Sequence, residues 1–346
     1  MNNIPVILVG GEGKRLWPMS DKKTPKQFLK FNSSYSLFQK SLLRLKKLNL
    51  SKPIIVCNEK DKKTISKEIK DISLEANILV EPLSQNTAPA VTVAALKANL
   101  EDNLVIFPCD HLIGNESKFS KAIKLGLKNC KSENFIIFGV KPTYAHTGYG
   151  YIKTQKTNIE DKYIVEKFIE KPEKKKAEKF LSLESYFWNC GIFIGKSKLF
   201  LKEIKSNHPM ILKSCQEAIR LGTQKNNIFL IDKGQYLKCS KISIDKAVME
   251  KAKKLLMIKI NTSWNDLGSW KSIWEISKKD KNNNYLSNNV ITKYTTNSYL
   301  NIKSKKVVAI GIEDMFIIEN NDSLLIINSK YLDEMKNIYK ILKNMK

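Results

Sequence analysis

Short apolar runs alternate with amphipathic segments over the first 140 residues, and this alternation constrains the fold more than any other feature. The apolar runs have the length of buried strands and lie at 4–9, 53–57, 77–81, 103–108 and 134–140. Segments with apolar residues at helical spacing separate them, at 36–48, 61–70, 88–99 and 117–129. Strands joined through helices need crossover connections, so the sequence predicts an α/β fold with an open, mostly parallel sheet and helices on both faces.

An open sheet of this kind binds its ligand at the carboxyl ends of its strands. The residues that directly follow a strand are therefore the first candidates for function. Three such stretches are rich in Gly and polar residues: GGEGKR at 10–15, PLSQNTAPA at 82–90 and CDH at 109–111.

The second half of the chain has a more mixed pattern. Strand-like runs lie at 149–155, 162–172 and 186–195. The polar stretch KKDKNNN at 278–284 is typical of a linker, and five short strand-like pieces and a closing helix at 330–343 follow it. We therefore expect a catalytic domain at 1–280 and a small C-terminal β domain with a closing helix at 285–346.

The net charge of +26 raises the question of a nucleic-acid partner. All but three of the 60 basic residues are lysine, and they are spread along a chain that is also rich in Asn and Ile. Because these three residue types share AT-rich codons, genome composition explains the excess, and we expect no nucleic-acid partner. No apolar run approaches the ~20 residues of a membrane span, and no secretion signal precedes the first strand, so we expect a cytoplasmic protein without a membrane partner.

The opening loop has glycines at positions 10, 11 and 13 but fits neither common nucleotide-binding motif. The third glycine of a dinucleotide fingerprint is absent, and Lys14 is followed by Arg15 rather than by the Ser or Thr of a P-loop. Taken alone, the glycines indicate either a tight turn or a backbone that approaches phosphates closely, with Arg15 and Lys26 as charge donors.

Eight motifs in order resemble the sugar-phosphate nucleotidylyltransferase family, and in particular its mannose-1-phosphate guanylyltransferase branch. They lie at 10–29, 81–90, 107–111, 147–152, 165–172, 187–194, 243–251 and 264–270. The resemblance implies a Rossmann-like nucleotide-diphospho-sugar transferase fold with a small C-terminal β-helix-like unit, in a short form without an isomerase domain. The chain departs from the family pattern at Gln85, where Arg is usual, in the region that recognises the base.

The implied reaction transfers GMP from GTP to α-D-mannose 1-phosphate and releases pyrophosphate. Its obstacle is the repulsion between two anions. A phosphate monoester with a second pKa near ~6 is largely ionised at neutral pH, so no general base is needed and positive charge must supply most of the acceleration. The three histidines of the chain agree with that expectation.

The resemblance assigns roles to the charged residues. Arg15 is expected to hold the β and γ phosphates, Lys26 the α phosphate and Lys171 the sugar phosphate. Asp110 and Asp266 are expected to bind Mg²⁺, which prefers oxygen ligands. For either Asp alone, a cap of a turn or helix is the alternative role.

The remaining candidates bind the two substrates, GTP and mannose 1-phosphate. The expected nucleotide-binding residues are Gly10, Gly11, Gly13, Gln85, Asn86 and Thr87. The expected sugar-phosphate residues are Gly148, Glu170, Lys171 and Asn189. The turn at 85–87 also fits a simple helix cap, and Glu170 with Lys171 a salt bridge at a strand end.

Three questions stay open at the level of sequence. The resemblance suggests a homodimer. Another sugar 1-phosphate or another nucleoside triphosphate is the alternative within the same chemistry. A nucleic-acid-binding or regulatory protein on the same fold is the alternative from a different class.

Overall fold

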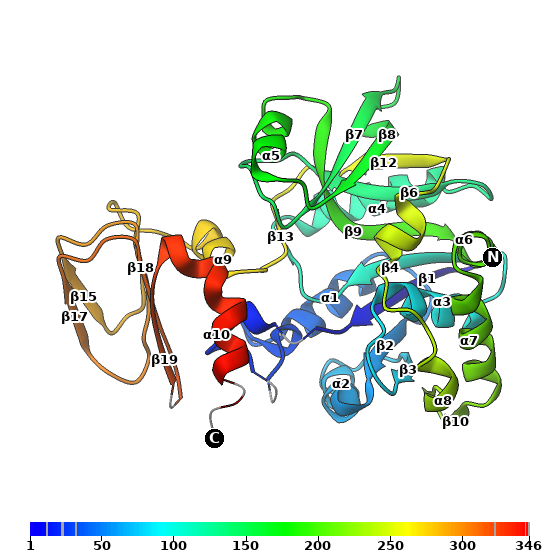
Figure 1. Cartoon of the computed structure of the whole chain (residues 1–346), viewed down its shortest axis with the longest axis horizontal. Coiled ribbons are helices and arrows are strands. Elements are labelled where there is room, and N and C mark those ends of the chain that lie inside the picture. Colours follow the sequence, from blue (N-terminus) through cyan, green and yellow to red (C-terminus); the bar gives the residue numbers. More distant parts are fainter. Residues whose placement is uncertain (12, 22–23, 32, 322, 343, 345–346) are drawn as a thin grey trace. The chain divides into compact units, whose positions relative to one another are not determined.

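The computed structural model describes the chain apart from residues 12, 22–23, 32, 322, 343 and 345–346 (Figure 1). The chain divides into two compact units, each built from separate stretches. The first unit contains Met1–Gly10, Gln39–Cys109 and Ile113–Trp264, and the second contains Gly11–Phe38, Asp110–Leu112 and Asn265–Lys346. The loop after the first strand thus belongs to the same unit as the C-terminal segment. The expected domains at 1–280 and 285–346 stay a prediction.

An eleven-stranded sheet forms the centre of the first unit, in the order β10-β11-β3-β2-β1-β4-β9-β6-β12-β8-β7. Its strands are β1 (Asn3–Val9), β2 (Ile54–Asn58), β3 (Asn77–Glu81), β4 (Asn103–Pro108), β6 (Phe135–Val140), β7 (Gly150–Lys156), β8 (Lys162–Glu170), β9 (Tyr186–Lys196), β10 (Thr223–Lys225), β11 (Ile228–Leu230) and β12 (Leu255–Lys259). The five apolar runs of the first 140 residues are all strands of this sheet.

The sheet is mixed, so the prediction of a mostly parallel sheet holds only in part. β11, β3, β2, β1 and β4 are parallel to one another, and β6 is parallel to β12. β9 is antiparallel to β4, β6 and β7, and β8 is antiparallel to β7 and β12. The β7–β8 pair has a local reason: only a short turn joins the two strands, so they form a hairpin instead of a crossover.

Helices cover both faces of this sheet, as expected. The helices of the unit are α1 (Leu37–Lys46), α2 (Lys62–Asp71), α3 (Thr87–Lys97), α4 (Glu116–Asn129), α5 (Lys174–Leu181), α6 (Ser197–Asn207), α7 (Pro209–Arg220) and α8 (Lys233–Tyr236), with the short turns η3 (Glu59–Asp61) and η4 (Asp245–Met249). On one face α3, α6 and α7 pack together over a core that includes Val6 and Ile106. On the other face Phe119 of α4 contacts Phe107 of β4, with ring centroids 6.3 Å apart.

The second unit combines the opening loop with small sheets. It contains η1 (Lys14–Leu16), η2 (Lys26–Phe28), α9 (Trp270–Ile276), β14 (Tyr285–Leu286), β15 (Val290–Lys293), β16 (Tyr299–Asn301), β17 (Val307–Ile310), β18 (Met315–Asn320), β19 (Ser323–Asn328), η5 (Ser329–Glu334) and α10 (Met335–Leu342). The two-residue strands β5 (Leu112–Ile113) and β13 (Trp264–Asn265) lie where the chain passes between units. β14, β16 and β18 pair in parallel, as do β15 and β17.

The closing helix begins later than the sequence predicts. Residues 329–334 form the 3₁₀ turn η5, in which the Asn328 side chain accepts the N–H of Lys330, and the α-helix starts at Met335. The last residue of the expected helix, Lys343, lies outside the described residues. Among the described residues, no helix is long and apolar enough to cross a membrane.

Gly126 in α4 offers a test of how tightly this helix packs on the sheet. A Cβ there would lie 2.6 Å from Cζ of Phe138 and 3.0 Å from Cδ1 of Ile194. We predict that Gly126→Ala lowers the free energy of unfolding by about 1–3 kcal/mol, although alanine usually favours a helix. Urea denaturation measures the change.

Gly234→Ala in α8 is the matched control. Its Cβ would meet only Asp232 Oδ1, at an ordinary 3.5 Å, so helix propensity should dominate and stability should rise by up to about 1 kcal/mol. Equal effects of the two substitutions would contradict the proposed close packing of α4.

Candidate active site

The C-terminal part of the second unit holds the glycine-rich opening loop in place. Leu16 and Leu29 are buried in one cluster with Trp270 of α9. The Trp270 indole N–H donates to the backbone oxygen of Trp17 at 2.9 Å, and the Asn320 amide donates to that of Pro18 at 2.8 Å. The loop is therefore a packed part of the second unit.

Two glycines in this loop have backbone conformations that other residues rarely adopt. Gly11 has a φ of 108° and Gly13 a φ of 60°. A Cβ on Gly13 would lie 2.6 Å from Cβ of Lys26, so the loop needs glycine there for space as well. The Ser20 hydroxyl donates to the Gly13 carbonyl at 2.5 Å, which joins the two ends of the stretch 13–20.

Lys26 is the best-defined cation among the predicted site residues. It is only 7% exposed, and its Nζ donates to Oδ2 of Asp110 at 2.6 Å and to the backbone oxygen of Asp266. Burial opposes ionisation of Asp110, yet the Lys26 ammonium and His111 hold the pKa of this carboxyl below its usual range. Asp110 is therefore an ionised carboxylate at neutral pH.

Asp266 reaches the same lysine through its main chain. Its Oδ1 accepts the N–H of Gly268 at 2.8 Å, and a Cβ at Gly268 would lie 2.5 Å from the other carboxylate oxygen. Leu267, between them, has a φ of 47°. Three segments of the second unit that are distant in sequence thus meet at Lys26.

A magnesium site at Asp110 and Asp266 stays a prediction. Within the described residues, no group of three or more His, Cys, Asp or Glu could hold a metal ion. Two carboxylates nevertheless suit Mg²⁺, which binds one or two protein carboxylates and takes its other ligands from water and substrate phosphates.

Arg15 lies in η1 and is half-buried. It forms no ion pair with any of the residues that the structure describes, so its guanidinium is available to an anion. Gly10 ends the stretch of the first unit that precedes this loop, and a Cβ there would meet nothing within 4 Å.

The predicted sugar-phosphate residues come together in the first unit. Lys171 Nζ lies 2.8 Å from Oε1 of Glu170, and Lys171 has a φ of 47°. The Asn189 amide donates to Oδ1 of Asp245 at 3.0 Å, and its oxygen accepts the N–H of Gly191 at 3.1 Å. Lys171 keeps 61% of its side chain exposed, whereas Glu170 keeps 16%.

Asp245 is a residue of this cluster to which the sequence assigned no role. Burial and the nearby Glu170 carboxylate raise its pKa to about 6, although hydrogen bonds from the backbone and Asn189 and the charge of Lys171 act in the opposite direction. It begins η4, a π-helical turn, a form often found at functional sites. The only sequence signal was its place in the motif SIDKAVMEK.

Gly148 lies beside an aromatic cluster. Its N–H donates to Nδ1 of His146 at 2.9 Å, and the His146 ring stacks on Tyr149 with centroids 3.8 Å apart. Tyr149 in turn contacts Trp188 and Trp264 edge to face. The backbone amide that was expected to contact the sugar is thus occupied by His146 in this structure.

The turn at 85–87 begins α3, and each of its residues has a structural role. The Asn86 side chain caps the helix by accepting the N–H of Thr87 at 2.8 Å, and the Thr87 hydroxyl accepts the N–H of Ile244 at 2.8 Å. Gln85 is 2% exposed and its Nε2 lies 3.4 Å from the backbone oxygen of Leu237. Its Oε1 accepts no hydrogen bond from the described residues.

Known proteins resemble this chain over nearly its whole length. Residues 4–283 match the family described as nucleotidyl transferase. An Escherichia coli protein named mannose-1-phosphate guanylyltransferase is 37% identical over 345 residues, which cover 97% of this chain and 74% of that protein.

Two solved structures are also similar. One, from Thermus thermophilus, is described as a mannose-1-phosphate geranyltransferase; it has a TM-score of 0.85 and 25% identity, covering 99% of this chain and 100% of that one. Another, from Helicobacter pylori, is described as a mannose-6-phosphate isomerase; it has a TM-score of 0.68 and 31% identity, covering 77% of this chain and 100% of that one.

The raised pKa of Asp245 predicts a pH-dependent stability difference. Because the folded state favours the protonated carboxyl, the protein loses stability from this group as pH rises from its ordinary pKa of 3.8 towards about 6, and the loss is complete above that. Asp245→Asn cannot titrate and still accepts a hydrogen bond from Asn189. We predict that the free energy of unfolding of the variant, relative to that of the wild type, is higher at about pH 7.5 than at about pH 4.

Urea denaturation of both proteins at the two pH values measures this difference. Comparing variant with wild type removes the contribution of the other titrating groups. A stability difference that is the same at both pH values would show that Asp245 is not held in its protonated form by folding.

Proposed function

We propose that this chain, which belongs to the nucleotidyl transferase family and within it to the mannose-1-phosphate guanylyltransferases, transfers GMP from GTP to α-D-mannose 1-phosphate. The structural observation that supports the proposal most directly is the environment of Lys26. An almost fully buried ammonium between the carboxylate of Asp110 and the main chain of Asp266 is a preorganised positive charge of the kind that phosphoryl transfer requires.

The reaction breaks one bond and forms one. An oxygen of the sugar phosphate attacks the α-phosphorus of GTP, the bond from that phosphorus to the bridging oxygen breaks, and pyrophosphate leaves with the electron pair. No proton needs to be removed from the nucleophile, since its second pKa near ~6 leaves it largely ionised. The protein must align the substrates and offset the repulsion between them.

In the second unit, Arg15 and Lys26 act on the triphosphate. Arg15 binds the β and γ phosphates through its guanidinium fork, which matches phosphate oxygens in pairs. Lys26 neutralises the charge that builds up on the α phosphate. Gly11 and Gly13 let the loop backbone approach the phosphates, since neither carries a side chain and both have positive φ.

In the first unit, Lys171 binds the phosphate of the sugar and Glu170 accepts hydrogen bonds from sugar hydroxyls. Hydrogen bonds to Asp245 and from Gly191 fix the orientation of the Asn189 side-chain amide. Gly148 contributes its backbone once His146 releases the amide. Gly10 and the turn of Gln85, Asn86 and Thr87 contribute to recognition of the base.

The unsatisfied oxygen of Gln85 supports a role in base recognition. A buried acceptor without a donor is costly, and the edge of guanine carries N–H donors. Asp110 and Asp266 would hold Mg²⁺ through their carboxylates, and the metal would supply positive charge against the substrate phosphates.

The second unit also supports two finer proposals. A small β-helix-like arrangement is supported by the parallel pairing of β14, β16 and β18. The rings of Tyr285 and Tyr299 also stack, with centroids 4.5 Å apart. β15 and β17 expose a row of large aliphatic side chains: Ile291 (70%), Val308 (66%) and Ile310 (63%). Such a row fits burial against a second copy of this chain in a homodimer.

A substrate panel tests the proposed function. We predict that pyrophosphate release is fastest with GTP and mannose 1-phosphate, and about tenfold or more slower with UTP, dTTP, CTP or ATP, or with glucose or fucose 1-phosphate. Chelation of divalent metal should abolish release, and added Mg²⁺ should restore it.

Each outcome of the panel has a clear meaning. Faster release with another pair would assign a different nucleotide sugar to the same chemistry. Isomerisation of mannose 6-phosphate without any pyrophosphate release would overturn the proposal and favour the activity for which the Helicobacter pylori protein is named.

A further inference from the structure

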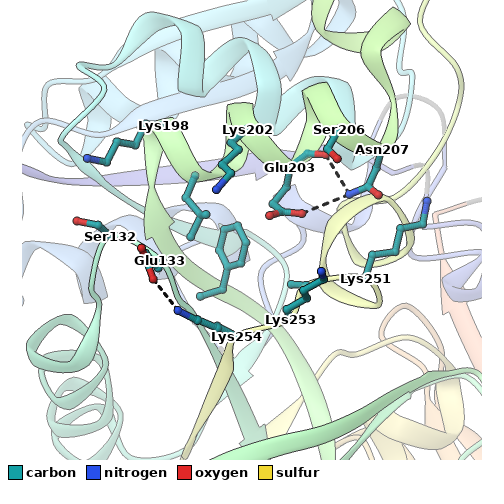
Figure 2. Close-up of a pocket in the computed structure, with 13 residues that line it drawn as sticks. Ser132, Glu133, Lys198, Lys202, Glu203, Ser206, Asn207, Lys251, Lys253 and Lys254 are labelled. Carbon is teal, nitrogen blue, oxygen red and sulfur yellow. Dashed lines mark hydrogen bonds and ion pairs between the residues drawn. The ribbon is translucent and has the colours of Figure 1, made fainter.

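A cavity of about 670 Å³ lies in the first unit, and no residue assigned to the candidate active site lines it (Figure 2). It is formed by α6, by the segment between η4 and β12, and by the turn before β6. Five of its lining residues are lysines: Lys198, Lys202, Lys251, Lys253 and Lys254. Only two carboxylates, those of Glu133 and Glu203, line it.

The charges in the cavity are only partly balanced. Lys254 pairs with Glu133 at 2.6 Å, and Lys198 pairs at 2.5 Å with Glu101, which does not line the cavity. The ammonium groups of Lys202 and Lys253 form no hydrogen bond or ion pair with the residues that the structure describes, although the charge of Lys202 helps to lower the pKa of Glu133. Figure 2 shows Lys202 of α6 and Lys253 of the segment before β12 on different sides of the cavity, so an anion in it would meet positive charge from two elements.

The remaining carboxylate is engaged within α6. The Asn207 amide lies 3.4 Å from Oε2 of Glu203 and donates to the Glu203 backbone oxygen at 3.0 Å (Figure 2). Phe135 and Leu199, both almost fully buried, form an apolar floor. An apolar floor with amines around it suits a small molecule that carries phosphate on a less polar body.

The cavity lies at the opposite end of a strand from the sugar-phosphate cluster. Phe135 begins β6, whereas Gly139 of β6 pairs with Asn189 of β9. Four residues of strand separate the two positions by about 13 Å. A ligand in the cavity would therefore occupy a site of its own.

We propose that this cavity binds a small anion that carries one or more phosphate groups, such as a phosphorylated metabolite or a free di- or triphosphate. Its volume falls in the range of about 300–1,000 Å³ for small-molecule sites, which favours a small ligand over a nucleic-acid chain. Unpaired ammonium groups attract phosphate dianions strongly because both partners are charged. The proposal does not depend on the function proposed above.

Hydrogen–deuterium exchange with inorganic pyrophosphate as the probe tests the site. We predict that pyrophosphate slows exchange in segments 198–207 and 250–255, with half-saturation below about 10 mM. In Lys202→Glu/Lys253→Glu the half-saturating concentration should rise about tenfold or more, since both unpaired amines become carboxylates. Both lysines are exposed, so the variant should fold.

The control is Lys205→Glu/Lys213→Glu, which makes the same change of net charge at exposed lysines of α6 and α7 outside the cavity. It should respond to pyrophosphate within about twofold of the wild type. Exchange in segment 13–29 reports the candidate active site separately and should be unaffected by the cavity variant. Three results would overturn the proposal. The first is that pyrophosphate protects neither segment 198–207 nor segment 250–255. The second is that the control variant shows the same rise in half-saturating concentration as the cavity variant, and the third is that a DNA oligonucleotide protects these segments more strongly.

Discussion

The interaction on which the candidate site depends is the contact of the Lys26 ammonium with the Asp110 carboxylate and the Asp266 carbonyl. A charge that is 7% exposed is costly unless it is paired, and here the partners come from segments 84 and 240 residues away. The ion pair therefore fixes the opening loop and the two predicted metal ligands within one unit. The same pairing keeps an ionised carboxylate and a fixed cation together, which a reaction between phosphates requires.

Two aspartates of the candidate sites illustrate how surroundings set charge. Asp110 has a cation in contact, and its pKa is low despite burial. Asp245 has the Glu170 carboxylate nearby and an amide as its hydrogen-bond donor, and its pKa is about 6. The first is suited to bind cations at neutral pH, whereas the second is suited to position a neighbouring amide.

Local sequence patterns predicted the features of the structure that are determined by residues close together in the chain. The apolar runs became strands. The family resemblance assigned Lys26 to the α phosphate and Asp110 to the metal, but no spacing rule predicts that the two residues are in contact. The antiparallel course of β9 was missed because a single glycine-interrupted strand does not reveal its partners. Trp270 also gave no signal that it holds the opening loop, since its hydrogen bond to Trp17 spans 253 residues. The raised pKa of Asp245 could not be predicted from the sequence, because it depends on burial and on residues that are distant in the chain.

Turnover of Lys26→Ala, compared with Lys30→Ala, tests the central claim most directly. Lys30 belongs to the same segment but is exposed, so its loss should leave the rate within a few-fold. We predict that Lys26→Ala lowers kcat about 100-fold or more, the usual effect of removing a preorganised group that stabilises developing charge, in protein whose circular dichroism matches the wild type. A folded Lys26→Ala protein with wild-type turnover would contradict the account.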